Sequence, residues 1–551
     1  MADGNVASGA RMLIDASALG AGDSLVFSGG AETNGFFTIR GGAGADNLTG
    51  GQQADTFNLT KGGNDAAHGG TGTDTFNMGG ALNAADAIDG GGGADTINLD
   101  GDYSSGLTLG ATTMTSVETI TFAAGHAYSV STNDATVASG TVLTVDASAL
   151  TGGGDHIFFD GSAETDGRFA ITSGAAGFFT GGALADTFNF TAATGTVSGN
   201  GGAGNDTFSL GANLRAGDAI DGGDDNDSVI VSGDYSAGIT FTATTLTNVE
   251  NLTLGGGHDY KFTTNEATIA SGGSLTVNMV ALGTGHTLTL DASAETDGAI
   301  VVTAGAAFTA ADSFIVGTGQ SALILNGDYT GGLTFGATTA ENLGDITLGG
   351  GHSYNITLND ATAAAGMAVD ATGLGAGDTL TLNVAAETNV TLDIFGGGGN
   401  DTITGGQAGD LINVGQGGND TVHGGSGANE IDIGGALTAA DSIDGGGNGG
   451  TYIAMAGDYT GANALVLGAT TVTGVAQLQL GSGDSYDITT NDATVASGAE
   501  LSVAADSLGA SDVLIFNGAA ETNGTFNIVG GAGDDTLTGG NGADTFTGGA
   551  G

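Results

Sequence analysis

The chain has no cysteine, proline or tryptophan among its 551 residues, and only six lysines and arginines stand against 61 aspartates and glutamates. Without cysteine there are no disulfides, so cysteine usage does not identify the compartment. The net charge of −55 argues against nucleic acid as a partner and against binding to an anionic membrane. No apolar run approaches the roughly 18 residues of a membrane-spanning helix, so we expect no membrane insertion.

Glycine is the most informative residue that is present in excess, with 110 copies. The absence of proline and of a G-x-y period excludes collagen, and an apolar content of 40% excludes a disordered polyelectrolyte. Aspartates outnumber glutamates by 50 to 11, which favours acids placed in turns. Glycine corners with one or two apolar side chains per turn are typical of a solenoid with a thin, continuous core.

Three sequence landmarks show that a large unit is repeated. Gly-Asp-Tyr-Ser/Thr begins at 101, 233, 327 and 457; Ala-Glu-Thr-Asn/Asp begins at 31, 163, 294, 386 and 520; Asn-Asp/Glu-Ala-Thr begins at 133, 265, 359 and 491. All three register the same shortening in the third copy. We therefore predict one continuous array over 1–551, made of modules 1–132, 133–264, 265–358 (shortened), 359–490 and 491–551. Because the chain starts and stops within a module, we expect it to belong to a longer array.

The modules contain a block of nine-residue units, eroded in the second copy and nearly absent from the third; it is best seen in residues 41–58, which read GGAGADNLT and GGQQADTFN. Repeated glycines allow tight turns, and the last three residues of each unit alternate as a very short strand. The aspartate closes the turn, and carboxylate and backbone carbonyl oxygens are the ligands that Ca²⁺ prefers.

These units resemble the calcium-binding nonapeptide of the repeats-in-toxin (RTX) proteins, G-G-x-G-x-D-x-U-x. The resemblance implies calcium as the bound ion. It also implies that each ion lies between two neighbouring turns. It also implies secretion without a cleaved N-terminal signal, which fits the start MADGNVASGARMLIDASAL. A C-terminal export signal, which the resemblance implies as well, is not recognisable in the chain.

The predicted metal ligands are the aspartates of the D-x-U triplets and the glycines of the tandem units. The aspartates are Asp46, Asp55, Asp65, Asp74, Asp95, Asp186, Asp206, Asp227, Asp401, Asp410, Asp420, Asp535 and Asp544. The glycines, through their carbonyls, are Gly42, Gly44, Gly51, Gly397, Gly399, Gly406, Gly531, Gly533 and Gly540. Asp86, Asp218 and Asp441 lie in a variant, A-x-D-x-I-D-G-G, without the preceding glycines, and are weaker predictions.

Between the glycine-rich blocks the sequence is rich in Thr, Ser and Val and alternates in short strands. The predicted fold is therefore all-β: an elongated parallel β-solenoid in which calcium-binding turns of about 18 residues alternate with plain turns, with about 20 residues per turn overall. A string of separate β-sandwiches joined by calcium rolls is the alternative.

Catalytic motifs are missing from the sequence. It contains neither H-E-x-x-H nor G-x-S-x-G, so we predict no enzyme. His126, His258 and His352 recur once per module, as turn or stacking residues do. His68 and His423 share a position beside a nonapeptide, where a zinc role lacks a companion His or Cys. The glutamate of Ala-Glu-Thr either adds a metal ligand or pairs with a turn amide.

The sequence thus predicts a non-enzymatic, calcium-dependent structural protein at a bacterial cell surface or secreted: a surface layer, a surface filament or an adhesin stalk. Its expected partners are calcium ions and further copies of itself, joined head-to-tail or laterally, and a cell-surface glycan is a further candidate. The alternative is a calcium-binding folding module of a larger secreted toxin or enzyme.

Overall fold

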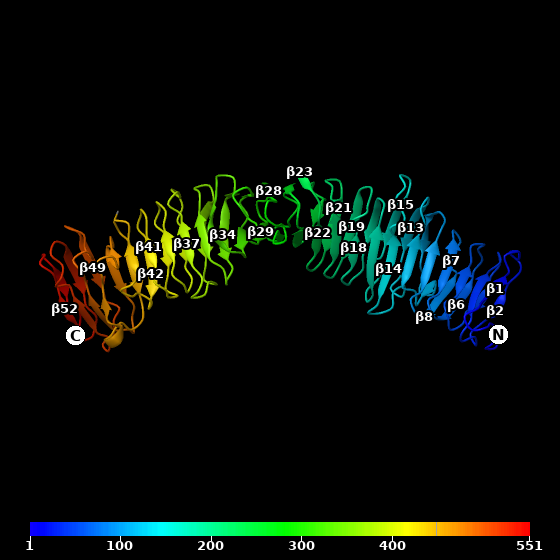
Figure 1. Cartoon of the computed structure of the whole chain (residues 1–551), viewed down its shortest axis with the longest axis horizontal. Coiled ribbons are helices and arrows are strands. Elements are labelled where there is room, and N and C mark those ends of the chain that lie inside the picture. The colour runs from blue at the N-terminus through cyan, green and yellow to red at the C-terminus, as the bar shows by residue number, and fades with distance from the viewer. Residues whose placement is uncertain (448) are drawn as a thin grey trace. The chain divides into compact units, whose positions relative to one another are not determined.

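The structure is a computed structural model that describes residues 1–447 and 449–551. The chain forms two compact units, Met1–Val277 and Asn278–Gly551, and in each unit short strands lie side by side in a stack (Figure 1). Neighbouring strands pair in parallel, as β3 with β5 and β5 with β7. The predicted all-β parallel β-solenoid is confirmed, with about 23 turns in the two units together.

Unit 1 has one long sheet and shorter sheets on the other side of each turn. The long sheet contains β1 (Arg11–Asp15), β3 (Phe36–Arg40), β5 (Thr56–Asn58), β7 (Thr75–Gly79), β9 (Thr96–Leu99), β12 (Thr119–Phe122), β14 (Val142–Ala147), β16 (Arg168–Ser173), β18 (Thr187–Asn189), β20 (Thr207–Gly211), β22 (Ser228–Val231) and β25 (Asn251–Leu254). The shorter sheets contain β2 (Val26–Ser28), β4 (Asn47–Thr49), β6 (Ala66–Thr71), β8 (Ala87–Gly92) and β11 (Met114–Thr115); β10 (Tyr103–Thr108), β13 (Ala127–Ser131), β15 (His156–Asp160), β17 (Gly177–Thr180), β19 (Val197–Gly202), β21 (Ala219–Gly223) and β24 (Leu246–Thr247); and β23 (Tyr235–Thr240) with β26 (Tyr260–Thr263).

Unit 2 repeats this arrangement, and β27 (Ser274–Asn278) spans the boundary residues. Its long sheet contains β29 (Ala299–Ala304), β31 (Ser321–Leu325), β34 (Leu343–Leu348), β36 (Ala363–Asp370), β38 (Asp393–Phe395), β40 (Leu411–Asn413), β42 (Glu430–Gly434), β44 (Tyr452–Met455), β47 (Gln477–Leu480), β49 (Glu500–Ala504), β51 (Thr525–Val529) and β53 (Thr545–Thr547). Its shorter sheets contain β28 (Leu288–Ala292), β30 (Ser313–Val316) and β33 (Ala340–Glu341); β32 (Tyr329–Thr334), β35 (Tyr354–Thr357), β37 (Leu380–Asn383), β39 (Thr402–Thr404), β41 (Thr421–His423), β43 (Ser442–Asp444) and β46 (Val472–Thr473); and β45 (Leu465–Val466), β48 (Tyr486–Thr489), β50 (Leu514–Asn517) and β52 (Thr536–Thr538).

The core of unit 1 contains a ladder of apolar side chains, one from each successive strand of the long sheet. In the strand register Ile39, Phe57, Phe76 and Ile97 follow one another, and all four are fully buried. The rings of Phe57 and Phe76 stack with their centroids 4.7 Å apart. Because a fully buried Phe or Ile stabilises a fold by about 1.5–3 kcal/mol, this single position per turn supplies much of the local stability.

Turn length differs between the two kinds of sequence. In the glycine-rich block of the first module, hydrogen bonds between equivalent corners of neighbouring turns join residues that are 18, 19 and 21 positions apart. In the plain region that follows, hydrogen bonds between neighbouring turns join residues 27 and 31 positions apart. The plain turns are therefore longer than predicted, because their corners are not fixed by tight glycine turns.

Helix is nearly absent. Within residues 1–447 and 449–551 the one helical element is the 3₁₀ turn η1 (Gly461–Asn463). In the same residues no helix has the length and apolar character required to cross a membrane.

The glycine after Ala-Glu-Thr-Asn/Asp marks a close contact between neighbouring turns. A Cβ placed on Gly35 would collide with the side chain of Val6, and Gly167 and Gly524 meet Val137 and Val495 in the same way. In the fourth module the two positions hold Val390 and Ala363. The bulky residue has thus moved from one turn to its neighbour, so that the pair still contains one large and one small side chain.

Candidate metal centre

The nonapeptide aspartates lie in columns that run from turn to turn. The Asp55 column consists of Asp55, Asp74 and Asp95, with Glu118 on the following turn. Each carboxylate accepts a backbone N–H from the turn before it: Asp55 Oδ1 from Phe37 N at 2.6 Å, and Asp74 Oδ1 from Asp55 N at 2.7 Å. Asp95 Oδ1 accepts from Asp74 N at 2.7 Å. One side-chain oxygen per turn thereby satisfies an amide at the corner, where the strand begins.

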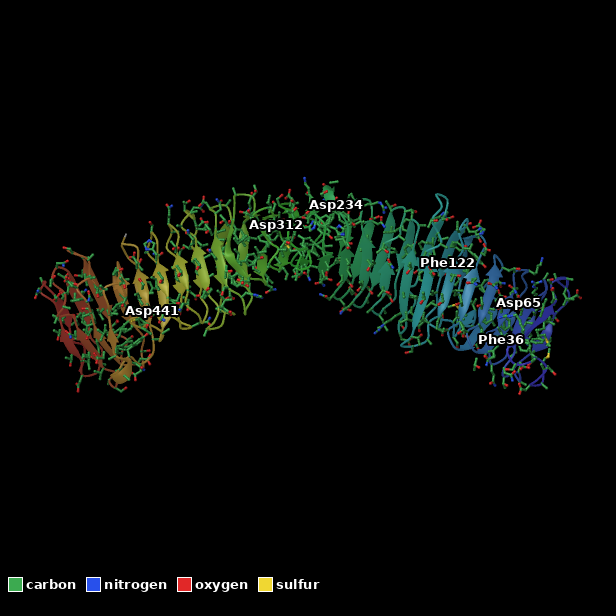
Figure 2. All side chains as sticks on the ribbon, viewed as in Figure 1. Phe36, Asp65, Phe122, Asp234, Asp312 and Asp441 are labelled. Atoms are coloured by element: carbon green, nitrogen blue, oxygen red, sulfur yellow. The ribbon has the colours of Figure 1, made fainter. Side chains whose placement is uncertain are left out.

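A second column, the Asp46 column, lies at the other corner of the first module and contains Asp46, Asp65 and Asp86. Asp65 Oδ1 accepts from Asp46 N at 2.9 Å, and Asp86 Oδ1 accepts from Asp65 N at 2.7 Å. Figure 2 shows Asp65 on the turns of unit 1. Asp86, a weaker sequence prediction, thus occupies the same structural position as the stronger ones.

The second module retains one column. In this Asp186 column, Asp206 Oδ1 accepts from Asp186 N at 2.6 Å, and Asp227 Oδ1 accepts from Asp206 N at 2.7 Å. Glu250 Oε2 then accepts from Asp227 N at 2.7 Å. The three predicted ligands of this module are therefore brought together on successive turns, although the sequence between them has lost its nine-residue period.

The other corner of the second module has one carboxylate, that of Asp218, a weaker sequence prediction, whose Oδ1 accepts from Val197 N at 2.9 Å. By strand register, Gly177 and Val197, at the start of β17 and β19, take the positions that Asp46 and Asp65 take just before β4 and β6. On the adjoining surface the rings of Phe158 and Phe178 are 45% and 62% exposed. Two of the three carboxylates of this corner have thus been replaced by glycine and valine on the same backbone path.

The fourth module again has two columns, of unequal composition. In the Asp401 column, Asp420 Oδ1 accepts from Asp401 N at 2.8 Å, and Asp441 Oδ1 accepts from Asp420 N at 2.7 Å. In the Asp410 column the next position holds Asn429, whose Oδ1 accepts from Asp410 N at 2.9 Å. A neutral amide can therefore take the structural place of the carboxylate.

The remaining predicted aspartates form shorter series. Asp535 Oδ1 accepts from Leu514 N at 2.9 Å, and Asp544 Oδ1 accepts from Phe526 N at 2.8 Å; both residues are half-buried. In the shortened third module, Asp312 Oδ1 accepts from Leu288 N at 2.7 Å (Figure 2).

The predicted glycines meet the carboxylates through their amides. Gly42 N donates to Asp46 Oδ2 at 2.8 Å and Gly51 N to Asp55 Oδ2 at 2.6 Å. Gly397, Gly406 and Gly531 donate in the same way to Asp401, Asp410 and Asp535. The predicted ligand role of these glycine carbonyls meets competition at three of them: the carbonyls of Gly51, Gly406 and Gly531 each accept an amide from the next turn. Gly44, Gly399 and Gly533 pack so closely on Asp23, Asp378 and Asp512 that a Cβ would collide with those carbonyls. Gly540 packs on Glu521 in the same manner.

Four buried aspartate oxygens in the described part of the chain have no hydrogen-bond partner: Oδ2 of Asp74, Asp95, Asp206 and Asp227. A Cβ on Gly69 would collide with both Asp74 Oδ2 and the Gly90 carbonyl oxygen, and a Cβ on Gly201 with both Asp206 Oδ2 and the Gly222 carbonyl oxygen. Pairs of oxygens thus converge on spaces that only glycine leaves open. A buried, unpaired carboxylate oxygen is costly, and a hard cation such as Ca²⁺ would relieve that cost, so the residues present fit calcium.

The electrostatics of the columns support the same conclusion. The pKa of Asp206 is raised to about 8, mainly by burial and in smaller part by the carboxylates of Asp186 and Asp227, against the hydrogen bond from Asp186 N, which lowers it. The pKa of Asp74 is likewise raised to about 7, mainly by burial and in smaller part by the carboxylates of Asp95 and Asp55. Without a cation these carboxyl groups resist ionisation at neutral pH, and a bound cation would favour their charged form.

Sequence reasoning missed the residues that follow the columns. Glu118 Oε2 accepts from Asp95 N at 2.7 Å, as Glu250 does from Asp227. Ser116 and Asn248 adopt left-handed φ values of 50° and 48°, and a Cβ on the facing glycine would collide with their carbonyls. A sequence pattern could have identified them: in V-E-x-U (Val117–Ile120, Val249–Leu252) the glutamate stands two residues before the apolar residue, as the aspartate does in D-x-U.

The histidines contact acidic residues on neighbouring turns. Nδ1 of His68 lies 2.8 Å from Asp89 Oδ2, and Nδ1 of His423 lies 2.8 Å from Asp444 Oδ2. His126 lies 3.2 Å from Asp100 and meets the ring of Tyr128 edge to face. These are pairwise contacts of partly exposed side chains, in keeping with turn and stacking roles.

Comparison with known families identifies the motif. The family model of the RTX calcium-binding nonapeptide repeat matches the chain four times, at residues 38–62, 393–417, 414–435 and 527–551. No curated protein and no solved structure matches the chain. The matched segments contain the first turns of both columns in the first, fourth and fifth modules. The chain therefore carries RTX calcium-binding nonapeptide repeats within a parallel β-solenoid.

Proposed function

We propose that this protein is a non-enzymatic, extracellular structural protein of a bacterial surface layer, surface filament or adhesin stalk, which folds and assembles on binding Ca²⁺. The observation that carries the proposal is the set of orphaned buried oxygens at Asp74, Asp95, Asp206 and Asp227. They lie on the inside of glycine turns and repeat along columns instead of converging on one reaction centre. A repeated site of this kind suits mechanical support better than catalysis.

Calcium in these columns would be held by the aspartates of successive turns and by carbonyl oxygens such as those of Gly90 and Gly222. When bound, the ion supplies positive charge and oxygen coordination. The chain contributes the rest: each Asp Oδ1 already holds the amide of the preceding turn, and the glycines keep the inner space open. Folding and metal binding are then coupled, because the column does not exist in the unfolded chain.

The expected affinity is that of extracellular calcium modules, roughly 10⁻⁴–10⁻³ M. At cytosolic calcium levels the columns would remain unfilled and mutually repulsive, whereas outside the cell they would fill. Self-association would also depend on calcium, because the net charge of −55 makes copies of the chain repel one another until cations neutralise the turns. Secretion by the route typical of RTX proteins is part of the same proposal.

Calcium titration of the metal-free chain tests this proposal, with circular dichroism for folding and sedimentation velocity for assembly. We expect β-structure to appear in the millimolar range and larger species to form with it. The informative variant is Asp206→Asn, which retains Oδ1 for Asp186 N, as Asn429 does in the fourth module. It should bind fewer ions and need more calcium.

The matched control is Asp234→Asn, which removes the same charge from an exposed turn of the same module (Figure 2). It should leave the titration unchanged. A β-spectrum indifferent to both chelator and calcium would refute the metal-coupled role. Calcium-dependent folding without any assembly would instead favour the folding module of a larger secreted protein.

A further inference from the structure

Two of the three sequence landmarks meet on neighbouring turns. Thr165 of Ala-Glu-Thr donates from its amide and its hydroxyl to Oδ1 of Asp134, at 2.9 and 2.5 Å, where Asp134 belongs to Asn-Asp-Ala-Thr. The same pair of hydrogen bonds joins Thr33 to Asp3, Thr388 to Asp360 and Thr522 to Asp492. An aspartate and the buried glutamate of the next turn are thereby held together in the first, second, fourth and fifth modules.

In the second module this contact gathers three carboxylates. Ligand oxygens of Asp134, Glu164 and Asp166 lie within 4.8 Å of one another. Glu164 is fully buried, and its oxygens accept from Gly167 N at 2.9 Å and Val137 N at 3.2 Å, whereas Asp134 and Asp166 are exposed. Three like charges at this separation disfavour one another strongly unless a cation lies between them.

The equivalent glutamates of the fourth and fifth modules give an independent sign of a missing partner. Glu387 and Glu521 are 2% and 0% exposed, and within the described residues their Oε2 atoms have no hydrogen-bond partner. Glu387 faces Asp360: burial raises the pKa of Glu387, and the Asp360 carboxylate raises it further. Hydrogen bonds from Thr388 are the main cause that lowers the pKa of Asp360, and a side-chain hydrogen bond with the Glu387 carboxyl lowers it as well. A buried acidic oxygen without a donor, turned to a second carboxylate, needs a cation or a proton.

We propose that the Asp134–Glu164–Asp166 cluster, and its counterparts Asp360–Glu387 and Asp492–Glu521, bind Ca²⁺ at sites outside the nonapeptide columns. The ligands are hard oxygens only, which selects Ca²⁺ over softer metals. The exposed aspartates give the ion access from solvent, and the buried glutamate fixes it to the turn. Water and backbone carbonyls complete the coordination.

The position of this site gives it a specific effect on the fold. The turn that carries the glutamate stacks directly on the first glycine turn of the next column: Ala183 N donates to the Glu164 carbonyl at 2.9 Å, and Gln407 N to that of Glu387 at 2.9 Å. A cation here joins the last plain turn to the first turn of the Asp186 column. It would make the plain turns responsive to calcium as well.

Anomalous diffraction from crystals of the full chain grown with Tb³⁺ in place of Ca²⁺ tests the site. A peak is expected among Asp134, Glu164 and Asp166, together with peaks along the Asp186 column. The double variant Asp134→Asn/Asp166→Asn should fold, because Asn keeps Oδ1 for Thr165 and because Asn34, Asn389 and Asn523 stand at the position of Asp166 in other modules. It should lose the first peak and retain the column peaks.

The outcomes separate this inference from the function proposed above. Column peaks without a peak at the cluster, or a cluster peak of equal height in the double variant, would overturn the new site alone. Absence of the peaks along the Asp186 column would overturn the proposed function. The presence or absence of the peak at the cluster would then decide the new site separately. As a second measurement, native mass spectrometry of the variant should count one calcium ion fewer than the unaltered chain.

Discussion

The first and second modules follow the same backbone path with different corners. The first closes both corners with carboxylates, the Asp46 and Asp55 columns. The second keeps carboxylates at one corner, the Asp186 column, and places Gly177 and Val197 at the other. Since both corners form parallel turns, the solenoid itself does not require aspartate. The carboxylates that remain, with their orphaned oxygens, are therefore better explained by a ligand than by the fold.

Chelation should separate these two modules most strongly. Without calcium the carboxylates of residues 41–99 repel one another at both corners, whereas residues 177–200 retain an apolar corner. Hydrogen exchange measured by mass spectrometry in chelator should show a large loss of protection in 41–99 and a smaller loss in 177–200. Uniform behaviour of the two segments would contradict a division into carboxylate and apolar corners.

Filling the inner space of a column should have the next largest effect. In Gly201→Ala the new methyl group would collide with Asp206 Oδ2 and the Gly222 carbonyl, so we expect a loss of about 1–3 kcal/mol in the free energy of unfolding, with weaker calcium binding. Gly153→Ala, in an open turn without a left-handed φ, serves as the control. Thermal unfolding in calcium measures the stability of both variants. Equal unfolding midpoints would contradict the inference that only glycine leaves the space beside Asp206 Oδ2 open.

The pH dependence should reverse when calcium is removed. Asp206, with a folded pKa of about 8 and an ordinary value of 3.8, binds its proton more tightly in the folded chain. In the metal-free protein the free energy of unfolding therefore falls as the pH rises from about 4 to 8, by at most about 1.4 kcal/mol per pH unit for such a group.

With calcium bound, protons compete with the ion, so stability should rise over the same pH range. Urea unfolding at pH 5 and pH 8, in calcium-free buffer and in calcium, measures both slopes. The same sign in both buffers would show that the buried carboxylates are not the groups that bind calcium.

The smallest predicted effect is the restoration of one carboxylate in the apolar corner. Val197→Asp places an acid where the first module has Asp65, next to Asp218, whose Oδ1 already accepts from Val197 N at 2.9 Å. We expect a modest loss of stability in chelator that calcium recovers. Equilibrium dialysis should detect additional bound calcium, and an equal loss with and without calcium would argue that a single carboxylate cannot recreate the site.

Local chemistry allowed the turns and strands to be predicted from the sequence. The glycine turns that end in D-x-U lead directly into β4, β5, β7 and β9, and the apolar residue U of each triplet is buried. The aspartates of the Asp186 column were predicted as ligands, but their stacking was not recognisable, because they follow one another at separations of 20 and 21 in the sequence, without a nine-residue period. Each separation is one full turn, a relation that only the stacked structure reveals. Likewise, Asp134 and Thr165 stand 31 positions apart in the sequence and meet because the plain turns are long.

The exchange of bulk between Gly35–Val6 and Val390–Ala363 has a consequence for the gene. Repeated modules invite unequal recombination, which lengthens or shortens an array. A crossover between the codons of these two positions would set valine against valine in one product and glycine against alanine in the other. Recombination involving the fourth module is therefore compatible with folding only where the breakpoint leaves both members of the pair together, and the lengths available to the array are restricted accordingly.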